Sequence, residues 1–280
     1  MQKINIDYLY LEITRRCNLE CAHCLRGKSE FKDISDEILK NIFSDISSIQ
    51  ELVLGGGEPL LVPNIIEKII KIILEKGIKV GKISFTTNGT VLSEKQIDIL
   101  QRLKSIAMLD VRLSHDKFHL LEMKRTGLVD KYKSNLLKFK ELLGYSPEDK
   151  FFHIDNYGIR RIGRAKHLTQ EDLDAINQWE YPTDYWLNVL GSSNTMNIVE
   201  IIDWDKEEIR VFGDLNISAN GDLTHSDREY ASEDKGLIFK LNVRNQSLLE
   251  VLKQYEFIYK ESLGEDYLDY REEIEQKHNR

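Results

Sequence analysis

The sequence is poor in cysteine and proline, with three and four of them in 280 residues. An odd, small number of cysteines excludes a disulfide framework. No apolar run reaches the ~18 residues that a membrane span needs, and residues 1–7 contain no signal-peptide core. We therefore expect a cytoplasmic protein with no membrane association.

The chain is rich in apolar and acidic residues. It is 41% hydrophobic, which excludes a disordered chain, and its 39 basic and 47 acidic residues give a net charge of −8. This charge makes nucleic acid an unlikely partner, because a polyanion-binding surface needs an excess of basic groups.

Apolar patterning predicts alternating strands and helices. Strand–helix alternation with short connections predicts parallel strands with helices outside, hence an α/β fold. This rhythm weakens after about residue 165, and a hairpin is predicted across the turn Ala219-Asn220-Gly221. The predicted strands cover 8–14, 51–54, 80–87, 107–114 and 151–155. Helices are predicted from 35, 64, 93, 117, 169 and 247.

All three cysteines lie within eight residues, at Cys17, Cys21 and Cys24, directly after the first predicted strand. Thiolates are soft ligands for iron–sulfur clusters or zinc, and three of them leave one iron of a 4Fe–4S cube open. Zinc with a histidine ligand (His23, His115 or His153) is an alternative, and so are buried, unreactive thiols.

Four segments at the ends of predicted strands together resemble the radical S-adenosylmethionine (SAM) superfamily. They are the C-x₃-C-x₂-C triplet, Gly56-Gly57-Glu58-Pro59-Leu60, Thr86-Thr87-Asn88-Gly89-Thr90 and Val111 to Asp116. The resemblance implies a partial, six-stranded parallel β/α barrel over residues 1–205, with a small α+β extension over 206–280.

The resemblance also implies the cofactors and the chemistry. One 4Fe–4S cluster would be held by the three cysteines, and SAM would bind its open iron. An external flavodoxin- or ferredoxin-type reductant would supply one electron, SAM would be cleaved, and a 5′-deoxyadenosyl radical would abstract hydrogen from the substrate.

The same motifs imply the residues that bind SAM. Gly56 and Gly57 let backbone approach a ligand closely, and Glu58 would accept hydrogen bonds from the SAM amino group. A tight turn explains the glycines equally well, as a structural role does for Asn88 and Ser114. The SAM-binding candidates are His23, Gly56, Gly57, Glu58, Pro59, Thr87, Asn88, Ser114, Asp116 and Arg164.

The second half resembles the SPASM or twitch extension of some family members, with its cluster ligands absent. Ile162-Gly163-Arg164-Ala165 resembles an element that precedes this extension, and Ser226 stands where the extension has a cysteine. With every cysteine assigned to one site, no thiolate remains for a second cluster.

Three functions follow from these patterns. The first is a radical SAM enzyme that acts on a peptide or small biosynthetic intermediate; the second has a nucleoside, nucleotide or sugar as substrate. A non-catalytic zinc or iron–sulfur module is the third. Candidate catalytic groups are His119, His153 and Asp155, for each of which a structural role is the alternative.

Overall fold

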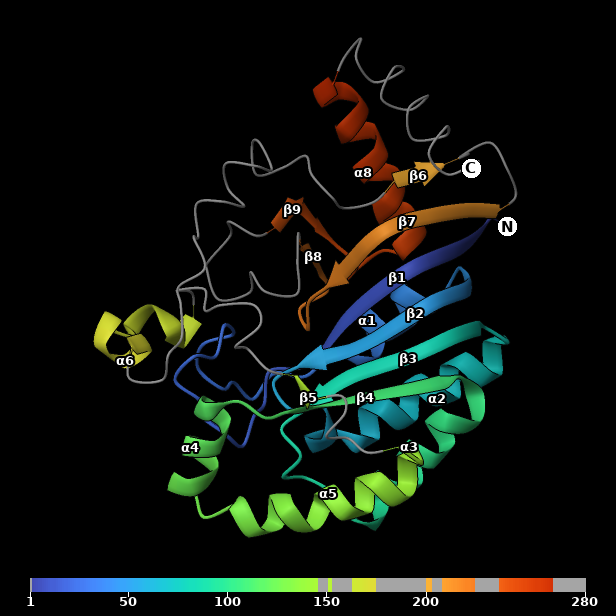
Figure 1. Ribbon diagram of the computed structural model, residues 1–280. Helices are drawn as coiled ribbons and strands as arrows, with labels where there is room; N and C mark the ends of the chain where they lie inside the picture. The colour runs from blue at the N-terminus through green and yellow to red at the C-terminus, as the bar shows by residue number, and fades with distance from the viewer. Residues whose placement is uncertain are drawn as a thin grey trace.

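The computed structural model describes residues 2–145, 151–152, 163–174, 200–202, 208–224 and 237–263. Within these ranges nine strands form one sheet, in the order β5-β4-β3-β2-β1-β7-β8-β9 with β6 paired to β7 (Figure 1). The strands are β1 (Lys3–Thr14), β2 (Ile46–Gly56), β3 (Lys79–Thr87), β4 (Met108–Ser114), β5 (Phe151–Phe152), β6 (Glu200–Ile202), β7 (Glu208–Ile217), β8 (Asp222–Thr224) and β9 (Leu237–Asn242).

The first five strands pair in parallel, each with the next along the chain. A sixth parallel strand, β7, lies on the other side of β1. The described sheet is open, which confirms the predicted partial β/α barrel. Because β1 to β4 run in the same direction, the loops that follow them meet at one edge.

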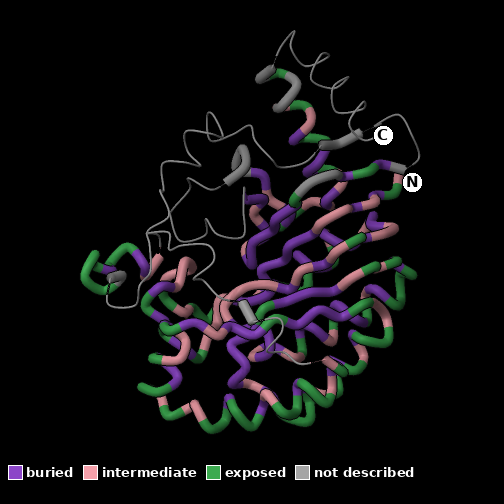
Figure 2. Tube along the Cα trace, in the orientation of Figure 1, coloured by how far each residue is buried: buried purple, intermediate pink, exposed green. Residues whose placement is uncertain are grey.

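Helices cover one face of the sheet, and the opposite face borders a cavity (Figure 1). Their apolar sides pack on the strands, which gives the buried layer seen in Figure 2. The helical segments are α1 (Asp36–Phe43), η1 (Pro59–Leu61), α2 (Pro63–Lys76), α3 (Glu94–Ile106), α4 (Lys117–Arg125), α5 (Val129–Leu143), η4 (Gly163–His167), α6 (Gln170–Asp174) and α8 (Leu248–Leu263). No helix in these ranges has both the length and the apolarity to cross a membrane.

Helix ends follow the predicted signals. The Ser35 side chain accepts from the backbone of Ile38, Ser93 begins α3 with a capping box, and Gly77 ends α2 in the left-handed conformation. The helical stretch predicted from residue 117 is two helices, because Gly127 turns the chain with a φ of 70°.

The predicted hairpin is the β7–β8 pair, whose turn contains Gly221 with a φ of 84°. β6 and β9 were not predicted; both are short and pair with strands of the same sheet, a relation that local patterning does not report. The division of the chain at residue 205 stays a prediction. The sequence also predicts a charged, solvated helix in the last twenty residues, most of which lie outside the described part of the chain.

Candidate cofactor site

The three cysteines line one cavity of about 510 Å³ at the carboxyl ends of β1 to β4. They lie on the loop that joins β1 to α1. Backbone hydrogen bonds join the two ends of this loop. The Arg15 amide donates to Lys32 O (2.7 Å), and the Ile34 amide donates to Ile13 O (3.0 Å). The Ser29 hydroxyl accepts from the Cys17 amide (2.9 Å) and donates to its carbonyl oxygen (3.1 Å). The loop therefore presents its thiols from a fixed backbone.

Cys17 and Cys21 lie in an environment that disfavours thiolate in the absence of a cation. Burial, assisted by the charge of Glu58, raises the pKa of Cys17 to about 12. Burial and the neighbouring Cys17 raise the pKa of Cys21 as well. These groups are poor free nucleophiles, but a bound metal can replace the proton and supply the missing positive charge.

The glycines after β2 allow the next loop to pack on the backbone of the cysteine loop. The Gly57 amide donates to Thr14 O (2.8 Å) and the Glu58 amide to Arg16 O (2.7 Å). A Cβ on Gly56 would overlap Thr14 O, and one on Gly57 would overlap Arg16 O. Both glycines also line the cavity, so close backbone approach holds the cysteine loop there and leaves peptide groups exposed to a ligand.

Glu58 is buried and joins the ends of β2 and β3. Its carboxylate accepts from the Thr87 hydroxyl (2.7 Å) and from the amides of Asn88 (2.7 Å) and Leu60 (3.1 Å). Burial raises the pKa of Glu58, and these hydrogen bonds oppose that increase. Pro59 is buried at the start of η1, and neither it nor Thr87 lines the cavity.

Asn88 connects the end of β3 to the cysteine loop. Its amide nitrogen donates to Asn18 Oδ1 (3.0 Å) and lies 3.9 Å from Cys17 Sγ, while its Oδ1 accepts from Thr90. The Asn88 side chain therefore makes the turn contacts predicted as an alternative and also lies beside Cys17. Ser114, at the end of β4, also lines the cavity.

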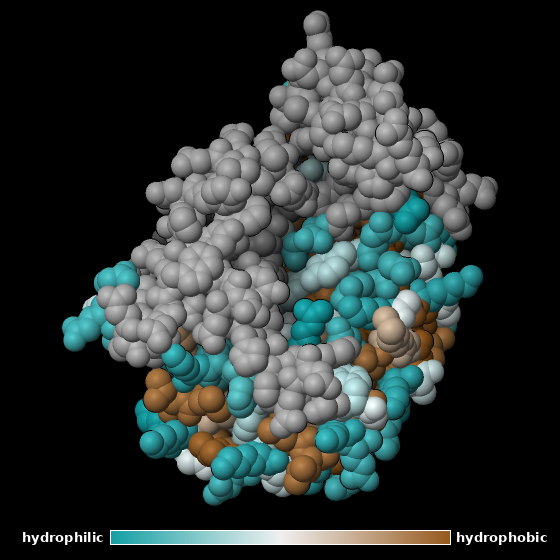
Figure 3. Space-filling view, in the orientation of Figure 1, coloured by the Kyte–Doolittle hydropathy of each residue, from teal (hydrophilic) through white to brown (hydrophobic). Residues whose placement is uncertain are grey.

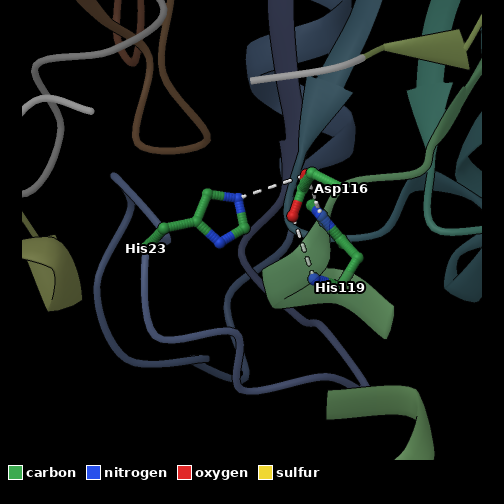
Figure 4. Close-up of side chains that lie close together, drawn as sticks. All are labelled: His23, Asp116 and His119. Carbon is green, nitrogen blue, oxygen red and sulfur yellow. Dashed lines mark hydrogen bonds and ion pairs between the residues drawn. The ribbon is translucent and has the colours of Figure 1, made fainter. Parts of the chain in front are cut away.

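Asp116 brings two histidines together, a grouping that the sequence did not reveal (Figure 4). It caps α4 by accepting from the His119 amide (3.0 Å), and its second oxygen bonds His119 Nδ1 (2.5 Å). His23 Nε2 lies 3.7 Å from that same oxygen. Asp116 is absent from the cavity wall, whereas His23 and His119 are part of it.

The charge states of this group follow from its burial. Burial, together with His119, lowers the pKa of His23 to about 3. Burial acts to raise the pKa of Asp116, but the hydrogen bond and charge of His119 outweigh it and lower that pKa to about 2. His23 is therefore neutral at pH 7 and stacks on Phe118. Its buried Nδ1 has no hydrogen-bond partner within the described part of the chain.

Arg164 fastens the η4 turn to the cysteine loop. Its amide donates to Cys24 O (2.9 Å) and its Nε donates to Cys21 O (2.8 Å). Gly163 has a φ of 59°, and its α-carbon faces the carbonyl groups of Cys24 and Leu25. The predicted SAM-binding arginine thus lines the cavity and holds Cys21 and Cys24 through their backbone.

Glu12 is a buried carboxylate that sequence reasoning missed. It accepts from Arg15 Nε (3.1 Å), Arg26 Nη1 (3.1 Å) and the Ala219 amide (3.0 Å), so it joins both ends of the cysteine loop to the β7–β8 turn. The signal was present in the sequence, since a single carboxylate interrupts the apolar run from Tyr8 to Ile13.

Two other histidines, His115 and His153, were considered as zinc ligands in the sequence analysis. His115 Nδ1 bonds the Tyr132 hydroxyl (2.8 Å), and His115 is not part of the cavity wall. His153 and Asp155, two of the three catalytic candidates, lie outside the described residues.

Part of the chain is similar in sequence to proteins of known name. GTP 3′,8-cyclase of Clostridium perfringens (strain SM101 / Type A) is 34% identical over 134 residues, which cover 45% of this chain and 40% of that protein. The tungsten-containing aldehyde ferredoxin oxidoreductase cofactor-modifying protein of Pyrococcus furiosus is 28% identical over 154 residues, 50% of this chain and 40% of the relative. The chain thus spans about two fifths of the length of these relatives.

A solved structure of anSMEcpe with bound AdoMet and Cp18Cys peptide aligns over 89% of this chain and 80% of that one, with 18% identity and a TM-score of 0.48. Residues 11–146, which include the cysteine triplet and the loops after β2, β3 and β4, match the model of the radical SAM superfamily. This match identifies residues 11–146 of the chain as a radical SAM domain.

Proposed function

We propose that this chain is a radical SAM enzyme that cleaves SAM reductively and abstracts hydrogen from a peptide or small biosynthetic substrate. The observation that carries the proposal is the convergence of Cys17, Cys21 and Cys24 on one cavity beside the Gly56-Gly57-Glu58 loop. The family implies one 4Fe–4S cluster and SAM as cofactors.

The residues present fit these cofactors. Three thiols on one anchored loop provide soft donors for three irons, and the raised pKa values of Cys17 and Cys21 mean that iron would replace their protons. The backbone of Gly56 and Gly57 and the Ser114 side chain offer polar groups to SAM in the same cavity. When bound and reduced, the cofactors supply a 5′-deoxyadenosyl radical.

The remaining groups position these contacts. Glu58 fixes the loop after β2 against the end of β3, Asp116 orients His119 beside His23, and Arg164 holds the backbone of the cysteine loop. Burial of these contacts excludes water, which protects a reactive radical from side reactions.

Anaerobic reconstitution tests the proposal. We expect about four irons per chain, and 5′-deoxyadenosine formed from SAM with a strong reductant. Cys17→Ala, Cys21→Ala and Cys24→Ala should each lose both properties. Ser105→Ala, on the outer helix α3, is the matched small substitution and should keep them. Zinc-loaded protein that leaves SAM intact under these conditions would refute the proposal.

A nucleotide is the second candidate substrate, because relatives at 34% identity are named GTP 3′,8-cyclase. The β7–β8 hairpin supports a SPASM-like extension and hence a peptide. Substrate-dependent formation of 5′-deoxyadenosine with GTP, or with peptides encoded beside the gene, separates the two candidates. The electron donor would be a flavodoxin- or ferredoxin-type protein.

A further inference from the structure

A row of four charged side chains crosses the cavity face of the sheet on β2, β3 and β4. Lys82 Nζ lies 3.0 Å from Glu51 and 3.4 Å from Asp110, and Arg112 Nη2 lies 3.4 Å from Asp110. The register places Lys82 beside Glu51. It places Arg112 beside Thr86, which lies nearer than Lys82 to the carboxyl end of β3. The motifs shared with the family do not include Glu51, Lys82 or Asp110.

These charges occupy partly buried positions. Side-chain exposure is 22% for Lys82, 25% for Glu51 and 9% for Asp110, against 49% for Arg112. Placing charges in such surroundings costs free energy, which apolar residues would avoid. Glu51, Lys82 and Arg112 line the same cavity as the cysteines. The row therefore faces the place where a substrate would have to lie to reach the bound cofactors.

The cavity wall is positively charged in an acidic chain. Among the described residues, its lining includes six Lys or Arg side chains and three Glu side chains, whereas the whole chain has a net charge of −8. SAM carries one net positive charge, and a cluster with three thiolates carries one net negative charge. The charges of the two cofactors would thus cancel, and the surplus of positive charge on the cavity wall would remain to attract an anion.

Two of these six cations stand on the sheet itself. Lys82 is held between two carboxylates, which fixes its ammonium group. Arg112 makes one hydrogen bond among the contacts described, although a guanidinium has five N–H donors. Its half-exposed side chain can therefore add a bidentate contact to a planar or tetrahedral anion. Figure 3 shows that the described surface over β2 to β4 is largely hydrophilic.

We propose that Lys82 and Arg112 bind an anionic group, a carboxylate or a phosphate, of the substrate. The inference rests on the proposed function and adds the charge class of the substrate. Glu51 and Asp110 are positioning residues that hold the two cations.

Binding of small anions to cluster-loaded, SAM-saturated protein tests this assignment. The probes are pyrophosphate and GTP for a phosphate, and succinate for a carboxylate, with dissociation constants from anaerobic calorimetry. We expect at least one probe to bind, and Arg112→Gln and Lys82→Met each to weaken it about tenfold or more. Arg102→Gln and Lys68→Met remove cations with similar ion pairs on the outer helices and should leave binding unchanged.

Each outcome decides one point. Preference for pyrophosphate and GTP supports a phosphorylated substrate, and preference for succinate supports a carboxylate. Failure of all three probes to bind wild type, or equal binding by Arg112→Gln and Arg102→Gln, overturns the proposal. Arg112→Gln is decisive if Lys82→Met does not fold, because the Arg112 side chain is half exposed. Formation of 5′-deoxyadenosine by wild type without any probe tests the proposed function separately.

Discussion

Replacement of Gly163 by alanine should disturb the cysteine loop from outside the segment that matches the family. A Cβ at this position would lie 2.5 Å from Cys24 O and closer still to Leu25 O, whereas real Cβ atoms stay at least 3.0 Å away. Because Leu25 O would lie 2.2 Å away, the backbone of the cysteine loop or of η4 must move by at least about 0.8 Å. The left-handed φ of 59° adds about 1 kcal/mol for alanine, and overpacking adds about 1–3 kcal/mol.

Gly127→Ala is the matched control. Gly127 has a φ of 70°, but nothing lies within 4 Å of the position that a methyl group would take there, so only the conformational cost of about 1 kcal/mol applies. We expect Gly163→Ala to unfold at lower denaturant than Gly127→Ala and to retain less iron after reconstitution. Denaturation followed by circular dichroism, with iron analysis, measures both. Equal stability and equal iron content in the two variants would refute the inference that η4 supports the cluster ligands.

Three further predictions concern buried polar groups. Glu12→Ala should lower the free energy of unfolding by about 3 kcal/mol, because it leaves Arg15 and Arg26 without their shared carboxylate. Glu37→Ala, on the surface of α1, is the control. A similar loss of stability in both variants would contradict the role of Glu12. The unfolded state protonates His23 near pH 6.5, whereas the folded state does so only near pH 3, so stability should fall by about 2 kcal/mol between pH 7 and pH 5. His23→Phe, which keeps the ring on Phe118, should lose less over that range in urea titrations of cluster-free protein, and an unchanged pH dependence would count against a buried neutral His23. Glu58→Gln should destabilise the fold by about 2 kcal/mol, because the new amide group would face the Thr87 and Asn88 donors. The control Glu67→Gln, on α2, should stay within about 0.5 kcal/mol of wild type. Denaturant midpoints of both variants measure the difference, and equal midpoints would contradict the role of Glu58.

The sequence predicted the elements whose signals are local. Helix caps at Ser35 and Ser93 and the glycine turn of the β7–β8 hairpin are set by residues a few positions apart, and all three were confirmed. The break at Gly127 and the short strands β6 and β9 were missed. The two strands depend on pairing with distant parts of the chain, to which short-range periodicity is insensitive. The break at Gly127 is a local turn with a left-handed φ, which the spacing of apolar residues does not report.

The cysteine spacing and the order of the strand-end motifs by themselves determined the family and the expectation of a partial β/α barrel. Only the tertiary structure decided which groups support the site. Asp116 joins His23 to His119, Glu12 joins the cysteine loop to the turn at Ala219, and Lys82 stands between carboxylates of two neighbouring strands. The physical reason is that a local motif fixes which ligands are near one another along the chain. The partners that neutralise and orient buried charge are chosen by the sheet register and by loop packing, which unite residues up to 207 positions apart.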